Sequence, residues 1–343
     1  MMKRSNSYTH NISRRKFLGR TAGIAAFTVM PISYSCTGKA GRAVKSESEP
    51  GLNSNFGGVQ IGAITYSWRS MPGGIENIIK YCKATGISSV ELMSGDLENY
   101  LGVPQNPMTG AARSAAAELT EEQKAAIEKY ARDLKEWRLT LPESKLAEVK
   151  GMFDRAGIGV HIVKFSPSRW SDEEIDYAFK SAKALGAMGV SEEIGEEPVK
   201  KLGPIAEKHG MYAVFHNHMQ FATPGFSYDP FLNVSPAVMM NFDAGHFFGS
   251  TGIHPNTIIE KYHDRIFSVH LKDKTGPGTD PPNTNQVWGQ GEVPIADVLK
   301  LIRDNKWPIY CDIELEYDIK PWSDAVKEVR NCVDYSRQIL LCS

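Results

Sequence analysis

From residue 58 onward the chain alternates short β-branched runs with amphipathic stretches, and this alternation constrains its fold more than any other feature. It predicts βα units and a parallel sheet, because parallel strands need a crossover segment between them. Eight strands are expected, at Gln60–Thr65, Ser88–Met93, Gly159–Phe165, Met188–Ile194, Met211–His216, Val238–Asp243, Ile266–Leu271 and Pro308–Glu314. Eight such units in about 285 residues match one α/β domain, a (β/α)8 TIM barrel. A doubly wound open sheet is the second choice, but Thr65–Arg69 lacks the glycine-rich turn that this fold favours after its first strand.

Helices are expected between the strands, at Thr120–Trp137, Glu143–Ala156, Glu173–Leu185, Glu197–His209, Ile295–Asp304 and Trp322–Leu341. In the third of these, Ile175, Phe179 and Ala182 recur at helical spacing before Gly186 ends the pattern. The segment Glu98–Leu146 is longer than an ordinary βα connection, so we expect an insertion on the active-site side of the barrel.

Residues 1–36 have the pattern of an export signal rather than of folded structure. Arg14 and Arg15 precede Phe17 and Leu18, and a short apolar run follows at residues 21–32. That run is too short for a membrane span, which needs about 20 apolar residues. The order resembles a twin-arginine signal, so we expect an exported, periplasmic protein.

Cys36 follows a loose lipoprotein cleavage box, which lacks the usual leucine because Ser33 stands in its place. A lipid anchor at Cys36 is therefore the one membrane attachment that the sequence predicts. Residues 37–57 are rich in Ser, Gly, Lys and Glu and are expected to form a flexible tether, which leaves residues 58–343 for the barrel.

Charge and cysteine patterns argue against several other classes of protein. The net charge of −1 gives no basic surface for nucleic acid. The five cysteines show no CxxC spacing, so neither a disulfide framework nor a zinc–thiolate cluster is expected. We also expect no nucleotide cofactor, and the sequence leaves the oligomeric state open.

Five consecutive predicted strands end in carboxylate or histidine side chains. These residues are Glu192, Glu193, His216, His218, Asp243, His246, His270, Asp273, Glu314 and Glu316. In a TIM barrel the carboxyl ends of the strands build the active site. Each histidine taken alone is more often a structural residue, but carboxylates mixed with imidazoles on successive strands suit one divalent ion of the Mn, Zn, Co or Fe class. The sequence therefore predicts a metal site at the barrel mouth.

The same segments carry a family resemblance. They are His216–His218, Asp243–His246, His270–Asp273 and Trp288–Glu292. In this order they resemble the xylose-isomerase-like superfamily of sugar isomerases and epimerases, whose domain is shared with certain abasic-site endonucleases (the AP-endonuclease family 2 domain). The resemblance covers roughly residues 58–340 and is specific for the superfamily rather than for one reaction.

The resemblance implies a ligand set and one departure from the family pattern. It places the metal on His216, Asp243, His270 and Glu314. Ketose 3-epimerases of the family carry a glutamate where this chain has His216, which puts a simple two-glutamate epimerisation in doubt. Glu193 is expected to restore a carboxylate to the site. Glu192, its neighbour, should point to the opposite face of the strand.

The expected chemistry is removal of a proton from the carbon next to a metal-bound carbonyl of a sugar. The candidate catalytic residues are Glu193, Lys272 and Glu316, and His218 is a further candidate base. The candidate substrate-binding residues are Tyr66, Trp68, Glu91, His218, His246 and Trp288. Aromatic residues are included because their flat faces stack on sugar rings, although lone aromatics are more often part of the core.

Four functions remain open at this stage. The main expectation is a metal-dependent sugar isomerase or epimerase acting on a small carbohydrate. The alternative is a lyase or hydratase that uses the same proton abstraction to eliminate a group from a 3-keto-glycoside. Export favours the alternative, because phosphorylated sugars are cytoplasmic metabolites. A non-catalytic sugar-binding lipoprotein is less expected, since a binder has no need of a metal and convergent bases. An abasic-site nuclease disagrees with export and with the neutral charge.

Overall fold

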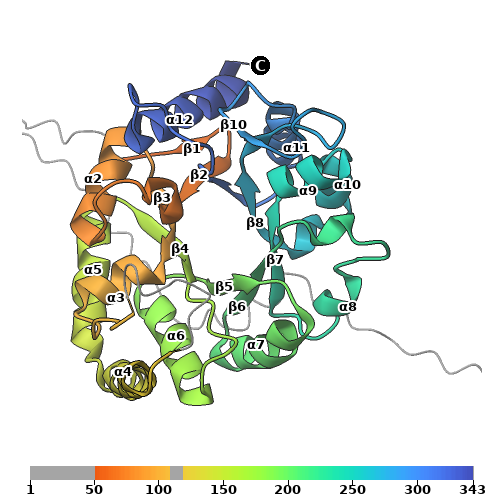
Figure 1. Ribbon diagram of the computed structural model, residues 1–343. Helices are drawn as coiled ribbons and strands as arrows, with labels where there is room; N and C mark the ends of the chain where they lie inside the picture. Colours follow the sequence, from red (N-terminus) through yellow and green to blue (C-terminus); the bar gives the residue numbers. More distant parts are fainter. Residues whose placement is uncertain (1–50, 109–118, 343) are drawn as a thin grey trace, which may run out of the picture. The chain divides into compact units, whose positions relative to one another are not determined.

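Eight parallel strands close into a barrel that Figure 1 views along its axis. In chain order they are β2 (Val59–Ile64), β3 (Ser89–Met93), β4 (Gly159–Lys164), β5 (Gly189–Glu193), β6 (Tyr212–His216), β7 (Val238–Asp243), β8 (Ile266–Leu271) and β11 (Tyr310–Ile313). The barrel closes because β2 pairs in parallel with both β3 and β11. This computed structural model describes residues 51–108 and 119–342, and the predicted signal, Cys36 and most of the tether lie outside them. The predicted TIM barrel is confirmed, and each predicted strand lies within two residues of its observed position.

Helices alternate with the strands and surround the barrel (Figure 1). The longer ones are α2 (Ile75–Thr85), α3 (Ser94–Tyr100), α4 (Glu121–Thr140), α5 (Glu143–Ala156), α6 (Asp172–Ala184), α7 (Glu196–His209), α9 (Ala244–Thr251), α10 (Asn256–Tyr262), α11 (Ile295–Asn305) and α12 (Ala325–Cys342). Short turns are η1 (Thr65–Trp68), η3 (Gln220–Ala222), α8 (Asp229–Leu232) and η4 (His263–Arg265). In the described part of the chain, no helix combines the length and apolar character that crossing a membrane requires.

Local signals explain where two of these helices begin. Ser171 and Glu174 form a capping box at the start of α6, which then buries Ile175 and Phe179 as the periodicity predicts. The start of α12 was predicted at Trp322 and is wrong by three residues. Asp324 Oδ1 accepts a hydrogen bond from the Lys327 amide, so the helix begins after this acidic cap.

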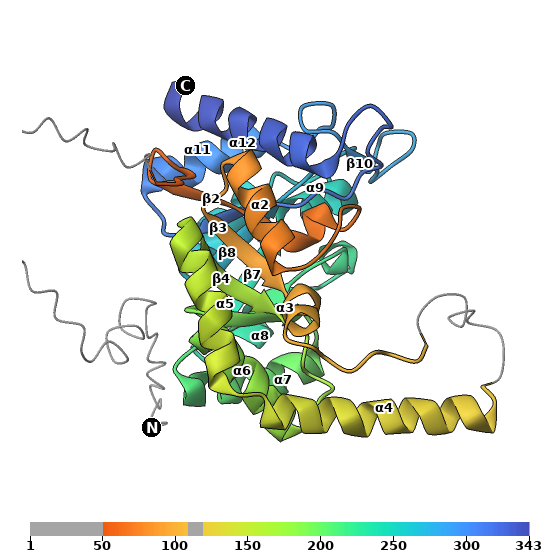
Figure 2. The same cartoon turned by 90° about the vertical axis from the view of Figure 1, so that its left-hand side faces the viewer.

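The long segment after β3 forms α3, α4 and α5. Figure 2 shows α4 projecting beyond the barrel on the same side as the short strand β10 (Asn285–Gln286). Arg138 anchors its last turn, because its guanidinium donates to Glu98 Oε1 at 2.9 Å and to Glu174 Oε1 at 3.1 Å. The same guanidinium lies 3.5 Å from the centre of the Trp170 ring. The predicted insertion therefore exists as a helix fixed at one end by a buried ion-pair network.

Polar side chains replace apolar ones inside the barrel. Gly62 makes this possible near β11, since a Cβ there would lie 2.1 Å from Asp312 Oδ1. Asp312 Oδ2 contacts His161 Nε2 at 2.9 Å, and His161 Nδ1 contacts Ser89 Oγ at 2.8 Å. Above this layer, the inward-facing residues at the strand ends form a larger polar cluster.

Candidate active site

The four residues predicted as metal ligands converge at the barrel mouth. His216 and Asp243 end β6 and β7, His270 lies near the end of β8, and Glu314 directly follows β11. All four are buried, and one nitrogen or oxygen atom from each lies within 4.8 Å of the other three. His216 Nε2 is 3.2 Å from Asp243 Oδ2, and His270 Nδ1 is 2.8 Å from Glu314 Oε2. Two imidazoles and two carboxylates at this spacing are a donor set that fits a divalent transition-metal ion.

Lys272 forms ion pairs with the carboxylates of this cluster. Its Nζ lies 2.8 Å from Asp243 Oδ2, 2.7 Å from Glu314 Oε2 and 2.8 Å from Glu316 Oε2, and its side chain is 2% exposed. Burial lowers the pKa of Lys272, but Asp243, Glu314 and Glu316 outweigh it and hold that pKa above its ordinary value. Lys272 is therefore an ammonium ion at neutral pH and is not free to act as a base.

Glu193 points into the mouth from the end of β5. Its Oε2 lies 3.1 Å from His216 Nδ1 and 3.4 Å from His218 Nε2, and its Oε1 accepts a hydrogen bond from Lys164. Burial raises the pKa of Glu193, but the His216 and Lys164 contacts outweigh it and keep that pKa below the ordinary value. Because its side chain is 41% exposed, this ionised carboxylate is open to a substrate.

Glu192 lies on the other side of β5, as the alternation of strand side chains predicts. It is buried, and its carboxylate accepts hydrogen bonds from the backbone amides of Ser168 and Glu193, both at 2.9 Å. Glu192 therefore holds the loop after β4 and does not reach the mouth.

Glu91 was expected to contact a substrate hydroxyl, but the structure places it beneath the cluster with no exposed surface. Its carboxylate accepts from Ser191 Oγ at 2.6 Å and Asn241 Nδ2 at 2.9 Å, and lies 2.7 Å from His270 Nε2. Burial raises the pKa of Glu91, but His270 outweighs it and lowers that pKa to about 2. This arrangement orients the His270 ring so that Nδ1 faces Glu314, the usual role of a carboxylate behind a histidine ligand.

His246 and His218 line the mouth. The backbone amide of His246 donates to Asp243 Oδ1 at 2.7 Å, so Asp243 also caps α9. His246 Nε2 lies 3.4 Å from Glu316 Oε2, and burial is the main cause that lowers the pKa of His246 to about 4. The His218 side chain is 54% exposed, and burial of part of the ring together with His216 lowers its pKa. Both rings are neutral at pH 7 and can bind hydroxyl groups.

The three predicted aromatic walls have different surroundings. Tyr66 is 38% exposed, with the Arg69 guanidinium carbon 4.5 Å from its ring centre. Trp68 is 2% exposed and packs on Tyr81, so its expected role as a pocket wall is wrong. The short turn η1 directs this ring into the core, and no face remains for a sugar. Trp288 is half-buried against Tyr335 of α12.

Asp273, at the end of the predicted seventh strand, has a structural role. Its carboxylate accepts hydrogen bonds from the backbone amides of Gly289 at 2.8 Å, Gly291 at 3.0 Å and Val293 at 3.1 Å. These bonds hold the loop that carries Trp288. Sequence reasoning also missed Lys164 and Asn241, which contact Glu193 and Glu91. Asn241 had a detectable signal, since it stands two residues before Asp243 and so shares its face of β7.

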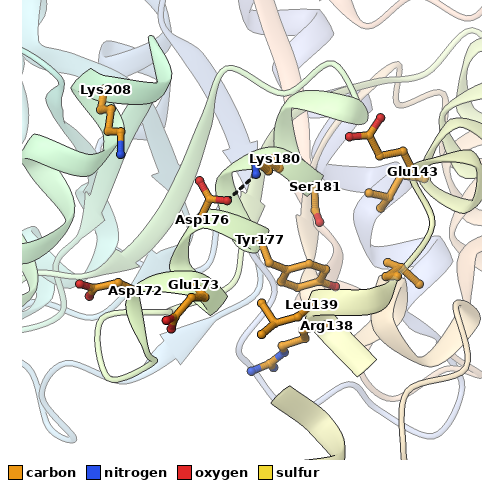
Figure 3. A pocket seen from close by; sticks show the side chains of 12 residues that line it. Arg138, Leu139, Glu143, Asp172, Glu173, Asp176, Tyr177, Lys180, Ser181 and Lys208 are labelled. Carbon is orange, nitrogen blue, oxygen red and sulfur yellow. Dashed lines mark ion pairs between the residues drawn. The ribbon is translucent and has the colours of Figure 1, made fainter. Parts of the chain in front are cut away.

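A hollow lies outside the barrel, between the end of α4, α5, α6 and the end of α7 (Figure 3). Figure 3 shows Asp176 paired with Lys180 and the Tyr177 ring beside Arg138. The predicted catalytic and ligand residues are absent from its lining. This hollow is therefore separate from the candidate active site.

Comparisons with known proteins found similar chains both by sequence and by structure. A curated inosose dehydratase of Klebsiella pneumoniae is 30% identical over 151 residues, which cover 38% of this chain and 50% of the relative. The chain thus spans about half the length of the curated relatives it matches. The probable 3-DHS dehydratase AsbF of Bacillus anthracis has a similar structure (TM-score 0.55, 12% identity, covering 80% of this chain and 98% of that one).

The IOLI protein with a bound zinc atom is also similar in structure (TM-score 0.53, 14% identity, covering 83% of this chain and 100% of that one). At these identities, the two solved structures support the fold alone. The profile of the xylose isomerase-like TIM barrel family matches residues 79–335. With the closed barrel, this match shows that the chain belongs to the xylose isomerase-like TIM barrel family.

Proposed function

We propose that this protein is a metal-dependent lyase that eliminates a β-oxygen substituent from a keto-sugar, with 3-keto-glycosides as the substrate class. The observation that carries the proposal is the ionised, half-exposed Glu193 beside the four-donor cluster of His216, Asp243, His270 and Glu314. The inosose dehydratase relatives support an elimination more directly than an isomerisation. The sequence-based preference for an isomerase or epimerase is therefore replaced by its alternative.

His216, Asp243, His270 and Glu314 would hold the metal, and the Lys272 ammonium would share Asp243 and Glu314 with it. A divalent ion in this position supplies Lewis acidity for a substrate carbonyl oxygen. Lys272 adds a fixed positive charge on the same side of the mouth. Negative charge that develops on a substrate oxygen there would be stabilised by the ion and by Lys272, which are already in position and need not move during the reaction.

Glu193 is the proposed base. Its carboxylate is ionised, reaches the mouth and is fixed by Lys164 and His216, so it can take the proton from the carbon next to the ketone. The electrons of the broken C–H bond form the new double bond as the neighbouring C–O bond breaks. The leaving oxygen takes the proton that Glu193 has removed, so it departs as an alcohol and Glu193 returns to its carboxylate form. His246, whose Nε2 lies 3.4 Å from Glu316 beside the cluster, can hold this oxygen by a hydrogen bond from its neutral ring.

The proposed substrates are neutral glycosides rather than sugar phosphates. The twin-arginine pattern at Arg14 and Arg15 motivates this choice, together with the proposed lipid anchor at Cys36. Both features fall outside the described residues. Fractionation of cells that make the full chain would test export, and a purely cytosolic pool would contradict it.

Product analysis separates the two reactions. Purified full-length protein, supplied with Mn²⁺ or Zn²⁺, is incubated with a 3-keto-glucoside that carries a chromogenic leaving group. A lyase releases the leaving group and leaves an unsaturated ketone. An epimerase keeps the leaving group and inverts a carbon, and that result would overturn the proposal. Glu197→Gln is the matched control, because this glutamate on α7 has an 89% exposed side chain.

A further inference from the structure

Lys274 is a buried lysine that the proposed reaction does not use. It belongs to β9 (Asp273–Lys274), which pairs with β10 (Asn285–Gln286), and it is 3% exposed. Its Nζ donates to Asn285 Oδ1 at 2.8 Å and, within residues 51–108 and 119–342, forms no ion pair with a carboxylate. An ammonium group has three N–H donors. Lys274 therefore retains capacity to donate to a ligand.

Asn283 presents an unused acceptor next to Lys274. Its Oδ1 is buried and has no hydrogen-bond partner among the described residues, and its Nδ2 contacts the exposed Met219 sulfur at 3.1 Å. Gly249 of α9 allows the close approach of both side chains. A Cβ there would lie 2.3 Å from Asn283 Oδ1 and 3.0 Å from Lys274 Cε, so these two atoms are no more than 5.3 Å apart.

His246 connects this pair with the candidate active site. It stands three residues before Gly249 on α9 and therefore lies on the same helix face. Its Nε2 faces Glu316, while its Nδ1 is buried without a partner in the described chain. A second link comes from Asn285, whose Nδ2 donates to the Glu316 carbonyl at 3.4 Å. His246 and Asn285 therefore link Lys274 and Asn283 to Glu316, at the edge of the candidate active site.

The combination of hydrogen-bond donors and acceptors on Lys274 and Asn283 indicates which kind of ligand could bind to them. Lys274 donates, Asn283 Oδ1 accepts, and a hydroxyl group can satisfy both. A phosphate or carboxylate only accepts, so it would face the Asn283 carbonyl oxygen and the carboxylate of Glu316 unfavourably. The exposed Met219 adds an apolar surface for the C–H face of a ring.

We propose that His246, Lys274 and Asn283 form a second sugar subsite, which binds the hydroxyl groups of the ring attached to the reacting sugar. This inference rests on the proposed function, because the attached ring would be the leaving group. It identifies the substrate class as a neutral disaccharide or related glycoside, with the reacting ring at the four-donor cluster and the second ring beside Glu316, at the edge where α9 meets the β9–β10 hairpin.

The test is equilibrium binding to the full chain by calorimetry, with methyl glucoside, a glucose disaccharide and glucose 6-phosphate as probes. The disaccharide should bind about tenfold more tightly than methyl glucoside, as expected for one or two additional hydrogen bonds. Lys274→Met and Asn283→Ala should each remove most of that advantage and leave methyl glucoside binding unchanged. Lys320→Met, at an exposed lysine, is the control.

Equal affinity for the mono- and disaccharide, no detectable disaccharide binding, or tighter binding of glucose 6-phosphate would each overturn the subsite. Lys274 lies in β9 and Asn283 in the loop before β10, and circular dichroism checks that each variant keeps its fold. Because these probes carry no ketone and do not react, the result is independent of the lyase assay. A preference for the disaccharide without elimination would support the subsite and reject the proposed reaction. Elimination without a preference for the disaccharide would support the reaction and reject the subsite.

Discussion

Lys272 Nζ lies 2.7 Å from Glu314 Oε2, and both side chains are shielded from solvent, at 2% and 7% exposed. The same ammonium contacts Asp243 and Glu316 at 2.8 Å, so one buried lysine pairs with three carboxylates. These contacts offset part of the negative charge of the cluster. They also explain how a group of acidic side chains can sit at the centre of a folded barrel.

Replacing Lys272 should therefore destabilise the metal-free protein. Lys272→Met removes the ammonium that pairs with the buried carboxylates of Asp243 and Glu314, at an expected cost of about 3–5 kcal/mol in the free energy of unfolding. Urea denaturation in the presence of a chelator measures this loss, with Lys320→Met as the control. The loss should shrink when Mn²⁺ or Zn²⁺ is added, because the metal compensates the same carboxylates. Unchanged stability in the chelator would contradict the role given to Lys272.

Asp243 should be needed for metal binding. Its Oδ2 lies 3.2 Å from His216 Nε2 within the four-donor cluster, so Asp243→Ala removes a central oxygen donor. Elemental analysis of the purified variant should show metal content well below that of the unaltered protein after identical dialysis. Asp176→Ala, on the outer surface of α6, is the control. Full occupancy in Asp243→Ala would show that the ligand set is wrong.

Glu91 should make the free energy of unfolding depend on pH in the acid range, from about pH 4 down to about pH 2. Its folded pKa of about 2 lies below the ordinary glutamate value of about 4.3. Ionised Glu91 therefore stabilises the fold above about pH 4, and this contribution of about 3 kcal/mol is lost as the pH falls toward 2. Urea midpoints measured across that range should fall less steeply for Glu91→Gln than for the unaltered protein. Parallel curves for the two proteins would reject this account, and Glu197→Gln provides the comparison for an exposed glutamate.

The sequence predicted the fold and the four-donor cluster for the same reason. In a parallel barrel all strands end at one mouth, so His216, Asp243, His270 and Glu314 converge once the strands are located. Alternation along β5 also separated Glu193 from Glu192 correctly. These inferences need only strand positions and the period of two.

Other features depend on details that one sequence does not display. The register between β3 and β4 shifts at Val90 and Glu91, so the depth of Glu91 in the barrel could not be counted from the strand ends. Trp68 was misplaced because the single turn of η1 directs its ring into the core. Lys274 and Asn283 come together through a hairpin and a close approach at Gly249, which no spacing in the sequence reveals.

Glu193 and Glu316 should differ in their effect on turnover. Glu193→Gln removes the proposed base and should reduce the rate by about 10²–10⁴-fold, the usual cost of losing a general base. Glu316→Gln should reduce it less, because Glu316 is paired with Lys272. Initial rates on the chromogenic 3-keto-glucoside compare the two, with Glu197→Gln as the control. A larger loss of turnover in Glu316→Gln than in Glu193→Gln would identify Glu316, rather than Glu193, as the base.

The central claim is that catalysis begins by breaking the C–H bond next to the substrate ketone. The most direct measurement is the primary isotope effect on turnover of a 3-keto-glucoside deuterated at that carbon, made together with mass-spectrometric detection of solvent deuterium in recovered substrate. The account predicts a rate that falls on deuteration, or exchange of that position with solvent, and predicts that Glu193→Gln abolishes any exchange. A substrate that turns over with neither an isotope effect nor exchange would contradict proton abstraction at this site.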